Sequence, residues 1–240
     1  MMGSDMEAIR TKIQERYALA ATGAGCCNGN ACCASDYSAD ELARIPAESV
    51  LGLGSGNPVR VAGLHPGETV VDLGSGAGVD VFLAASVVGA QGRAIGVDMT
   101  PAMVDRARGA AHSPRAPNTS FVLAPIERIP LADNIADVVL SNCVINLSPD
   151  KPAVFAEAFR ILKPGGRLAI SDIVQERDLG KIEDDCGCVA TAMVRAEYLN
   201  TIRDAGFREL HIAEDRAWRT GSNGVEASAV TLVARKPGGR

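Results

Sequence analysis

The chain has 240 residues, of which 47% are hydrophobic and 22% charged, and its formal net charge is −5. This size and composition suit one α/β domain with a large core, or such a domain with an appended segment. Acids and bases are interspersed and aromatic residues make up only 4%, which argues against a nucleic-acid partner. No apolar run reaches the ~20 residues that cross a membrane, and the charged start does not resemble a signal peptide. We therefore expect a cytoplasmic protein with no membrane partner.

The first 45 residues predict a helix followed by a cysteine-rich arm. Residues 5–20 have the pattern of an amphipathic helix, and "ATGAGCCNGNACCAS" (21–35) is a loop of small residues. Ser38 and Glu41 have the spacing of a capping box that opens a short helix. The glycine-rich "LGLGSGNP" (51–58) predicts a loop over the ligand crevice, and a plain connector is an equal alternative.

From residue 67 onward, strands and helices alternate. This pattern predicts an α/β, Rossmann-like fold: a seven-stranded, mainly parallel sheet with helices on both faces and a ligand crevice at the carboxyl ends of the strands. We expect a core at residues 46–175 and, at residues 176–240, a helical segment covering the substrate and then the last two strands. The expected strands are 68–75, 93–98, 119–124, 135–147 (with Cys143 at the strand end), 167–174, 208–215 and 227–236. The expected helices are 78–89, 100–110 with Thr100 as cap, 150–162 and 178–205.

A glycine loop follows the first of these strands. In "VVDLGSGAGVD", the dinucleotide pattern G-x-G-x-x-G fails because residue 79 is valine. The spacing D-x-G-x-G-x-G resembles motif I of class I S-adenosylmethionine (SAM) methyltransferases, and Asp98, at the end of the next strand, resembles their ribose-binding acid. The resemblance implies SAM as cofactor, bound by Asp72, Gly74, Ser75, Gly76, Gly78, Asp98 and Met99.

Two further segments are expected to contact the cofactor. In "LAPIERIPLADN", Ile126 and Glu127 occupy the place where these methyltransferases contact adenine, although a solvated loop acid is an equal interpretation of Glu127. Asn142, at the end of the fourth strand, is also expected to contact the cofactor.

Seven cysteines without an export signal indicate thiols for ligation, redox chemistry or packing. Cys143 is expected at the rim of the crevice, and Cys188 lies in the segment expected to cover the substrate. A structural zinc site in the arm is an alternative, but vicinal cysteines do not easily direct both thiolates at one metal. Cysteine–histidine catalysis has less support, because none of the three histidines falls at a triad position. The arm contains Cys26, Cys27, Cys32 and Cys33.

Several segments resemble the arsenite SAM methyltransferases. They include "IPAESVLGLGSGNP", "LHPGETVVDLGSGAGVDVFLAA", "IGVDMTPAMVDRAR", "SNCVINLSPDKPAVFAEAFRILKPGGRLAISDIV" and "GCVATA". The resemblance implies SAM-dependent methylation of trivalent arsenic, with Cys143 and Cys188 as the thiolates that hold it. It also implies a trivalent arsenical substrate and a thiol reductant, glutathione or a thioredoxin-like protein. Two thiolates suit arsenic because it is a soft, thiophilic element.

Ser55 departs from the family pattern, because members commonly have a third cysteine in "GCGNP" where this chain has "GSGNP". Our hypothesis is that two thiolates suffice and that methylarsonous acid is accepted at least as well as arsenite. Cys186 could replace the missing thiol. Two alternatives remain open: methylation of another soft nucleophile or small metabolite, and a thiol-based metalloid-binding protein.

Overall fold

The computed structural model describes residues 2–23, 36–112, 116–178, 189–218 and 227–239. Their seven strands form one sheet in the order β3-β2-β1-β4-β5-β7-β6, in which β7 runs antiparallel to both neighbours and the other pairs are parallel. The predicted seven-stranded, mainly parallel sheet is confirmed. The strands are β1 (Thr69–Leu73), β2 (Arg93–Asp98), β3 (Thr119–Leu123), β4 (Ala136–Asn142), β5 (Leu162–Gln175), β6 (Arg208–Trp218) and β7 (Ala227–Arg235).

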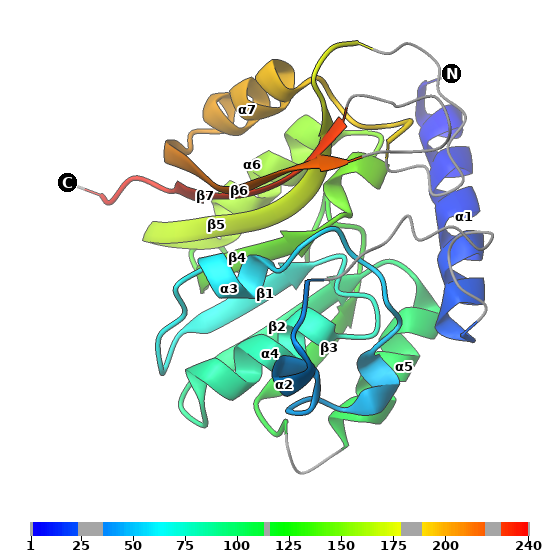
Figure 1. Ribbon diagram of the computed structural model, residues 1–240, viewed down its shortest axis with the longest axis vertical. Coiled ribbons are helices and arrows are strands. Elements are labelled where there is room, and N and C mark those ends of the chain that lie inside the picture. The colour runs from blue at the N-terminus through cyan, green and yellow to red at the C-terminus, as the bar shows by residue number, and fades with distance from the viewer. Residues whose placement is uncertain (1, 24–35, 113–115, 179–188, 219–226, 240) are drawn as a thin grey trace.

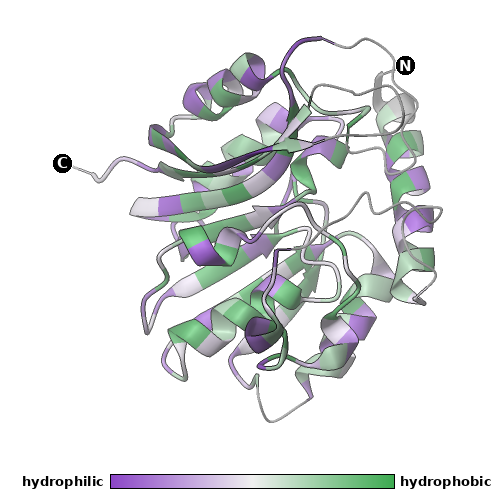
Figure 2. Ribbon diagram, in the orientation of Figure 1, coloured by the Kyte–Doolittle hydropathy of each residue, from purple (hydrophilic) through white to green (hydrophobic). Residues whose placement is uncertain are grey.

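Helices cover both faces of the sheet and pack on separate parts of the core (Figure 1). On one face lie α3 (Pro58–Val61), α4 (Val79–Val88) and α5 (Pro101–Ala111); on the other lie α6 (Lys151–Ile161) and α7 (Arg195–Asp204). Figure 2 shows that hydrophobic residues are concentrated in the central strands and α4. Residues buried on both faces explain why β1 and β4 are nearly continuous apolar runs rather than alternating ones.

The amino-terminal helix α1 (Met2–Ala21) stands at the side of the molecule, next to the ends of the strands (Figure 1). Its side chain Gln14 donates a hydrogen bond to the Met99 carbonyl at 2.8 Å. Arg106 of α5 donates to the Ala21 carbonyl at 2.7 Å, at the other end of the helix. The helix α1 is thus attached to the core at two points.

Most of the expected element boundaries are correct. The Ser38–Glu41 capping box opens α2 (Ala39–Leu42), as expected, and two short 3-10 turns are also present, η1 (Ala47–Ser49) and η2 (Ile145–Leu147). Thr100 occupies the cap position of α5, but its side chain makes no capping hydrogen bond.

Three expected boundaries are wrong. The fourth strand ends at Asn142 rather than continuing to residue 147, because Cys143 has a left-handed backbone (φ 60°) that interrupts the ladder before η2. Helix α7 begins at Arg195, so the helix expected over 178–205 is absent from residues 189–194, where the chain turns. The fifth strand is also longer than expected, because its pairing with β4 extends back to Leu162.

Candidate active site

A pocket of about 1080 Å³, counted to its open mouth, lies at the carboxyl ends of β1, β2 and β4. This is the crevice that the alternating topology predicts. Its walls come from the glycine loop after β1, the ends of β2 and β4, the loop before α3 and one side of α1. The loop at residues 51–58 contributes Leu51, Leu53 and Gly54 to the wall, so the expectation that it lies over the crevice is confirmed.

The glycine loop turns by using left-handed backbone at alternate residues. Gly74, Gly76 and Gly78 have φ values of 68°, 52° and 97°, a region that residues with a Cβ rarely adopt. A Cβ on Gly74 would lie 2.3 Å from the Val144 side chain, so the segment that follows β4 packs directly against the loop. Gly78 does not line the pocket; a Cβ there would meet the rings of Phe82 and Phe121 at 2.9 Å. The third glycine therefore serves packing beneath the loop.

Asp98 closes the pocket on the β2 side. Its carboxylate accepts hydrogen bonds from the Gly76 backbone at 2.9 Å and from the Thr100 backbone at 2.8 Å. Burial raises the pKa of Asp98, while these two hydrogen bonds oppose the rise. The hydrogen bond from Gly76 joins the end of β2 to the glycine loop. The two segments expected to bind the cofactor are therefore held together by Asp98.

Two buried polar atoms of the pocket wall have no hydrogen-bond partner among the described residues. They are Oγ of Ser75 and Nε of Arg10. The Asp72 carboxylate lies in the same wall on a residue only 3% exposed, and burial together with the nearby charge of Asp80 raises its pKa well above the usual value. Unsatisfied buried donors and acceptors are costly in an empty protein interior. Their position around one pocket fits a bound molecule with several polar groups.

Asn142 is the centre of a hydrogen-bond network rather than a free pocket group. Its amide nitrogen contacts the hydroxyl of Tyr37 at 2.8 Å, the carbonyl of Gly56 at 2.9 Å and the carboxylate of Asp80 at 3.3 Å. Its amide oxygen accepts a hydrogen bond from the Ser55 backbone at 2.9 Å. The Asn142 side chain therefore attaches the loop before α3 to the end of β4, although the residue does line the pocket.

Glu127 is not the solvated loop acid of the alternative interpretation. Its side chain is only 9% exposed, accepts a hydrogen bond from the Ser148 hydroxyl at 2.6 Å and lies 3.4 Å from a guanidinium nitrogen of Arg10. Arg10, Ile13 and Tyr17 line the same pocket. Helix α1 thus covers the pocket on the side of Glu127.

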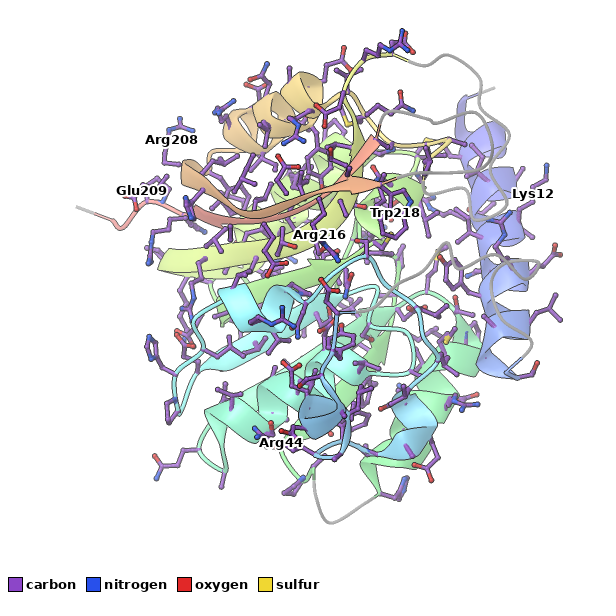
Figure 3. The ribbon with its side chains drawn as sticks, in the orientation of Figure 1. Lys12, Arg44, Arg208, Glu209, Arg216 and Trp218 are labelled. Carbon is purple, nitrogen blue, oxygen red and sulfur yellow. The ribbon has the colours of Figure 1, made fainter. Side chains whose placement is uncertain are left out.

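Cys143 lies in the pocket wall directly after β4. Its backbone nitrogen donates to the Ser171 carbonyl on β5 at 2.8 Å, and its left-handed φ is unusual for a residue with a side chain. The half-buried side chain packs against an apolar cluster that also contacts Trp218 at the end of β6 (labelled in Figure 3). That cluster consists of Leu147, Ile173, Val189, Ala192, Ala227 and Ala229.

Six cysteines lie outside the described residues. Val189, which directly follows Cys188 in the sequence, is 1% exposed and belongs to the apolar cluster at Cys143. The described part of the chain contains no group of three or more His, Cys, Asp or Glu side chains with the arrangement of a metal site. The six cysteines outside the described residues are Cys26, Cys27, Cys32, Cys33, Cys186 and Cys188.

Another buried acid, Asp172, lies behind Cys143. Asp172, on β5, accepts hydrogen bonds from the Asn146 amide at 2.7 Å and the Tyr198 hydroxyl at 3.1 Å. Burial raises the pKa of Asp172 to about 7, against the effect of these donors and of Lys151. Neither Asp172 nor Tyr198 lines the pocket, so this network supports the turn that carries Cys143 from behind.

Ser55 is fully buried and outside the pocket wall. Its hydroxyl lies 3.3 Å from that of Ser171, which in turn accepts a hydrogen bond from Thr231 at 3.2 Å. Arg216 of β6 (labelled in Figure 3) donates to the Ser55 carbonyl at 2.8 Å. The serine side chain is therefore directed into the sheet, where three hydroxyl groups contact one another.

Every expected cofactor residue except Gly78 lines the pocket. Pocket residues on α1, Tyr37 after the cysteine-rich arm and Asp80 on α4 were not predicted from the sequence. Asp80 follows the glycine loop by two residues, so proximity in sequence was an available signal. No local pattern identified Tyr37 or α1, because only the fold brings them to the pocket.

The chain is similar to known methyltransferases. Residues 64–211 match the model of a methyltransferase domain. The arsenite methyltransferase of Halobacterium salinarum is 41% identical over 97% of this chain and 68% of that protein. The arsenite methyltransferase of Aquipseudomonas alcaligenes is also 41% identical, over 64% of this chain and 48% of that protein.

Among solved structures, the arsenic(III) S-adenosylmethionine methyltransferase of Chlamydomonas reinhardtii is similar at a TM-score of 0.68 and 32% identity, over 84% of this chain and 71% of that one. Together with the strand order and the pocket, this likeness defines a class I SAM-dependent methyltransferase, with SAM as the cofactor. Within that class, the chain belongs to the arsenite methyltransferase family. No helix among the described residues is long and apolar enough to cross a membrane.

Proposed function

We propose that this protein methylates trivalent arsenic, with SAM bound in the pocket and arsenic held by the thiolates of Cys143 and Cys188. The observation that carries the proposal is the position of Cys143. It lies in the wall of the cofactor pocket, one strand away from the glycine loop that follows β1. The names of the relatives support the same substrate, arsenite.

The chemistry explains why thiols are needed here. Trivalent arsenic exchanges its hydroxide groups for thiolates, because both partners are soft. A thiolate-bound arsenic retains a lone pair that can attack a methyl group. SAM supplies that methyl as an electrophile on a sulfonium, and the protein's contribution is to align the two partners. Val189, buried in the cluster at Cys143, supports the expectation that Cys188 approaches the same site.

The cofactor-binding roles are proposals too. We infer that Asp98 accepts from the ribose hydroxyls, and that Ile126 and Glu127 contact the adenine. The main chain of the glycine loop would approach the methionine portion, since a Cβ on Gly76 would meet only the sulfur of Met103, at 3.9 Å. The unpartnered Ser75 hydroxyl and Arg10 Nε are available as further donors.

The test is an assay of reduced protein with SAM and either arsenite or trivalent methylarsenic, followed by separation of the arsenic species. Wild type is expected to produce methylated arsenic. The Cys143→Ser and Cys188→Ser variants should lose at least about 100-fold in kcat/KM, because a hydroxyl is a poor ligand for arsenic. Cys186→Ser, two residues from Cys188, is the comparison: it should keep the activity of wild type if two thiolates suffice and lose activity if Cys186 replaces the missing thiol. Full activity in Cys143→Ser would refute the thiolate site and favour an organic methyl acceptor.

Ser55 bears on the choice of substrate. Its side chain is buried among hydroxyl groups rather than facing the pocket, which supports a site with two thiolates. We expect Ser55→Cys to leave the ratio of arsenite to methylarsenic turnover unchanged within about twofold, a change below ~0.5 kcal/mol. A shift of that ratio towards arsenite would indicate that a cysteine at this position reaches the substrate.

A thiol reductant is the proposed further partner. When the arsenic lone pair becomes an arsenic–carbon bond, arsenic is formally oxidised to the pentavalent state. Two electrons from a pair of thiols, which become a disulfide, restore the trivalent state. Product analysis with glutathione or a thioredoxin-like protein, each added separately, would identify the reductant by the appearance of trivalent product.

A further inference from the structure

Cys143 has a backbone conformation that strand pairing alone does not stabilise. On β4, Val138 and Leu140 pack on one face of the sheet and Val139 packs on the other. An extended residue 143 would continue this alternation on the face of Val139. The left-handed φ of 60° interrupts the alternation, and Cys143 lies in the pocket wall. A residue with a Cβ keeps such a conformation only where surrounding contacts impose it.

Two contacts with β5, which lies beside β4 in the sheet (Figure 1), restrain this turn. The Cys143 backbone nitrogen donates to the Ser171 carbonyl at 2.8 Å, where the turn begins. Three residues later, the Asn146 amide donates to the Ile173 carbonyl at 2.6 Å. The turn is therefore attached at both ends to alternate residues of one strand, which opposes a return of Cys143 to extended backbone.

Asp172 and Tyr198 complete this attachment. The Asp172 carboxylate accepts a hydrogen bond from the Asn146 amide at 2.7 Å and another from the Tyr198 hydroxyl at 3.1 Å. All three side chains are at most 1% exposed. The Asn146 oxygen has no hydrogen-bond partner among the described residues, and a buried unpartnered oxygen costs stability. The Asn146 amide thus serves the geometry of the turn at the expense of stability.

These three residues act on the pocket from outside it. Asn146, Asp172 and Tyr198 do not line the pocket, so they do not touch a molecule bound there. Burial and Asp172 raise the pKa of Tyr198, and Cys143 adds to the rise. The thiol is therefore within electrostatic range of the network that holds its turn.

We propose that Asn146, Asp172 and Tyr198 form a clamp of positioning residues, which holds Cys143 in its left-handed conformation and thereby aligns arsenic with the methyl donor. This inference rests on the proposed function, because it takes Cys143 as a ligand of arsenic. Rotation of a cysteine side chain can preserve arsenic binding, whereas methyl transfer requires alignment of the arsenic lone pair with the methyl group. The clamp therefore affects turnover more than the affinity for arsenic.

The first test measures kcat and KM for arsenite at saturating SAM. Tyr198→Phe deletes one hydroxyl and keeps the ring, which packs edge-on against Phe155 at a centroid distance of 5.5 Å. It should lower kcat about three- to tenfold and leave KM within about twofold. Asp172→Ala should lower kcat further. Asp172→Asn should recover most of that loss, because an amide oxygen can still accept from Asn146.

The matched control is Ile161→Val, which loses packing in the apolar cluster that also contains Tyr198. Ile161 directly precedes β5, whereas the clamp lies near the other end of that strand. Urea unfolding should show a loss of stability in this variant, and its kcat should remain that of wild type. An unchanged kcat in Tyr198→Phe and Asp172→Ala, or an equal loss of kcat in Ile161→Val, would overturn the proposal.

Alkylation of Cys143 by iodoacetamide, measured by mass spectrometry of its peptide, separates this inference from the proposed function because it needs no arsenic. Release of the turn should raise the alkylation rate of the half-buried thiol at least about threefold in Tyr198→Phe, but not in Ile161→Val. If wild type forms no methylated arsenic, the proposed function fails and the alkylation rates alone decide on the clamp. Equal rates in all the variants and wild type would contradict it.

Discussion

At the scale of single residues, the site depends on backbone conformations that most side chains exclude. Gly74 and Gly89 share the same left-handed φ of 68°, but their surroundings differ. A Cβ on Gly74 would overlap Val144 at 2.3 Å, whereas a Cβ on Gly89 would meet no atom within 4 Å. The two positions therefore separate the cost of backbone strain from the cost of overpacking.

This contrast gives a matched prediction. Gly89→Ala should lower the free energy of unfolding by about 1–3 kcal/mol, the cost of a backbone conformation (φ 68°, ψ −172°) that residues with a Cβ rarely adopt. Gly74→Ala should lower it by a further 1–3 kcal/mol or so, because Val144 must move, and it should also weaken SAM binding. Urea unfolding and calorimetry of both variants check this. Equal losses of stability would mean that the loop relaxes away from Val144 without cost.

At the scale of elements, α1 acts as a wall of the pocket that is held by hydrogen bonds to the core. Arg106 of α5 donates to the Ala21 carbonyl at the end of α1 and to the Glu48 carbonyl in η1. Arg106 does not line the pocket itself. Its effect on cofactor binding is therefore transmitted through the position of α1.

We expect Arg106→Ala to raise the SAM dissociation constant about three- to tenfold, mainly through faster dissociation, since loss of a charged hydrogen bond is worth about 1.5 kcal/mol or more. The matched control is Arg108→Ala on the same helix, where the arginine donates to the Phe121 carbonyl of β3 instead. Stopped-flow measurement of SAM dissociation compares the two. A similar increase in both variants would assign the effect to α5 rather than to α1.

At the scale of the whole molecule, buried acids determine how stability depends on pH. Burial raises the pKa of Asp80 to about 6 and that of Asp172 to about 7, above the value near 4 of an unfolded aspartate. The folded protein therefore binds more protons than the unfolded chain between about pH 4 and 7, and these groups lose their favourable contribution as the pH rises. Partly exposed acids such as Glu68, whose pKa is lowered by Arg167, have the opposite effect on stability. Their favourable contribution to the free energy of unfolding is lost only as the pH falls below about 4.5.

Without cofactor, the protein should thus be more stable at pH 5.5 than at pH 8. The share of Asp80 between these two pH values is about 0.8 kcal/mol, because at pH 5.5 a group whose folded pKa is about 6 is already partly ionised. Urea unfolding at both pH values tests this, and Asp80→Asn should reduce the difference. A wild-type protein that gains stability from pH 5.5 to 8 would show that these acids are paired in solution.

Much of the fold follows from local patterns. Apolar runs that contain Asp72, Asp98 and Asn142 predicted three neighbouring strands, because a strand buried on both faces needs an unbroken apolar sequence. The prediction of a helix over 178–205 was wrong, because α7 starts only at Arg195. Helical composition in that region did not reveal the turn at Val189–Ala192, where packing against β5 and β7 overrides local preference.

The sequence by itself determined the glycine loop, the acid at the end of β2 and the thiol at the end of β4, because each of these belongs to one short segment with its own spacing. Only the tertiary structure decided the partners of Asp80, the burial of Ser55 and the cover of α1 over the pocket. Tyr37 and Asp80 are 43 residues apart, and Ser55 and Ser171 are 116 residues apart. Contacts over such separations arise when the sheet brings the strand ends together, and no local pattern of residues encodes them.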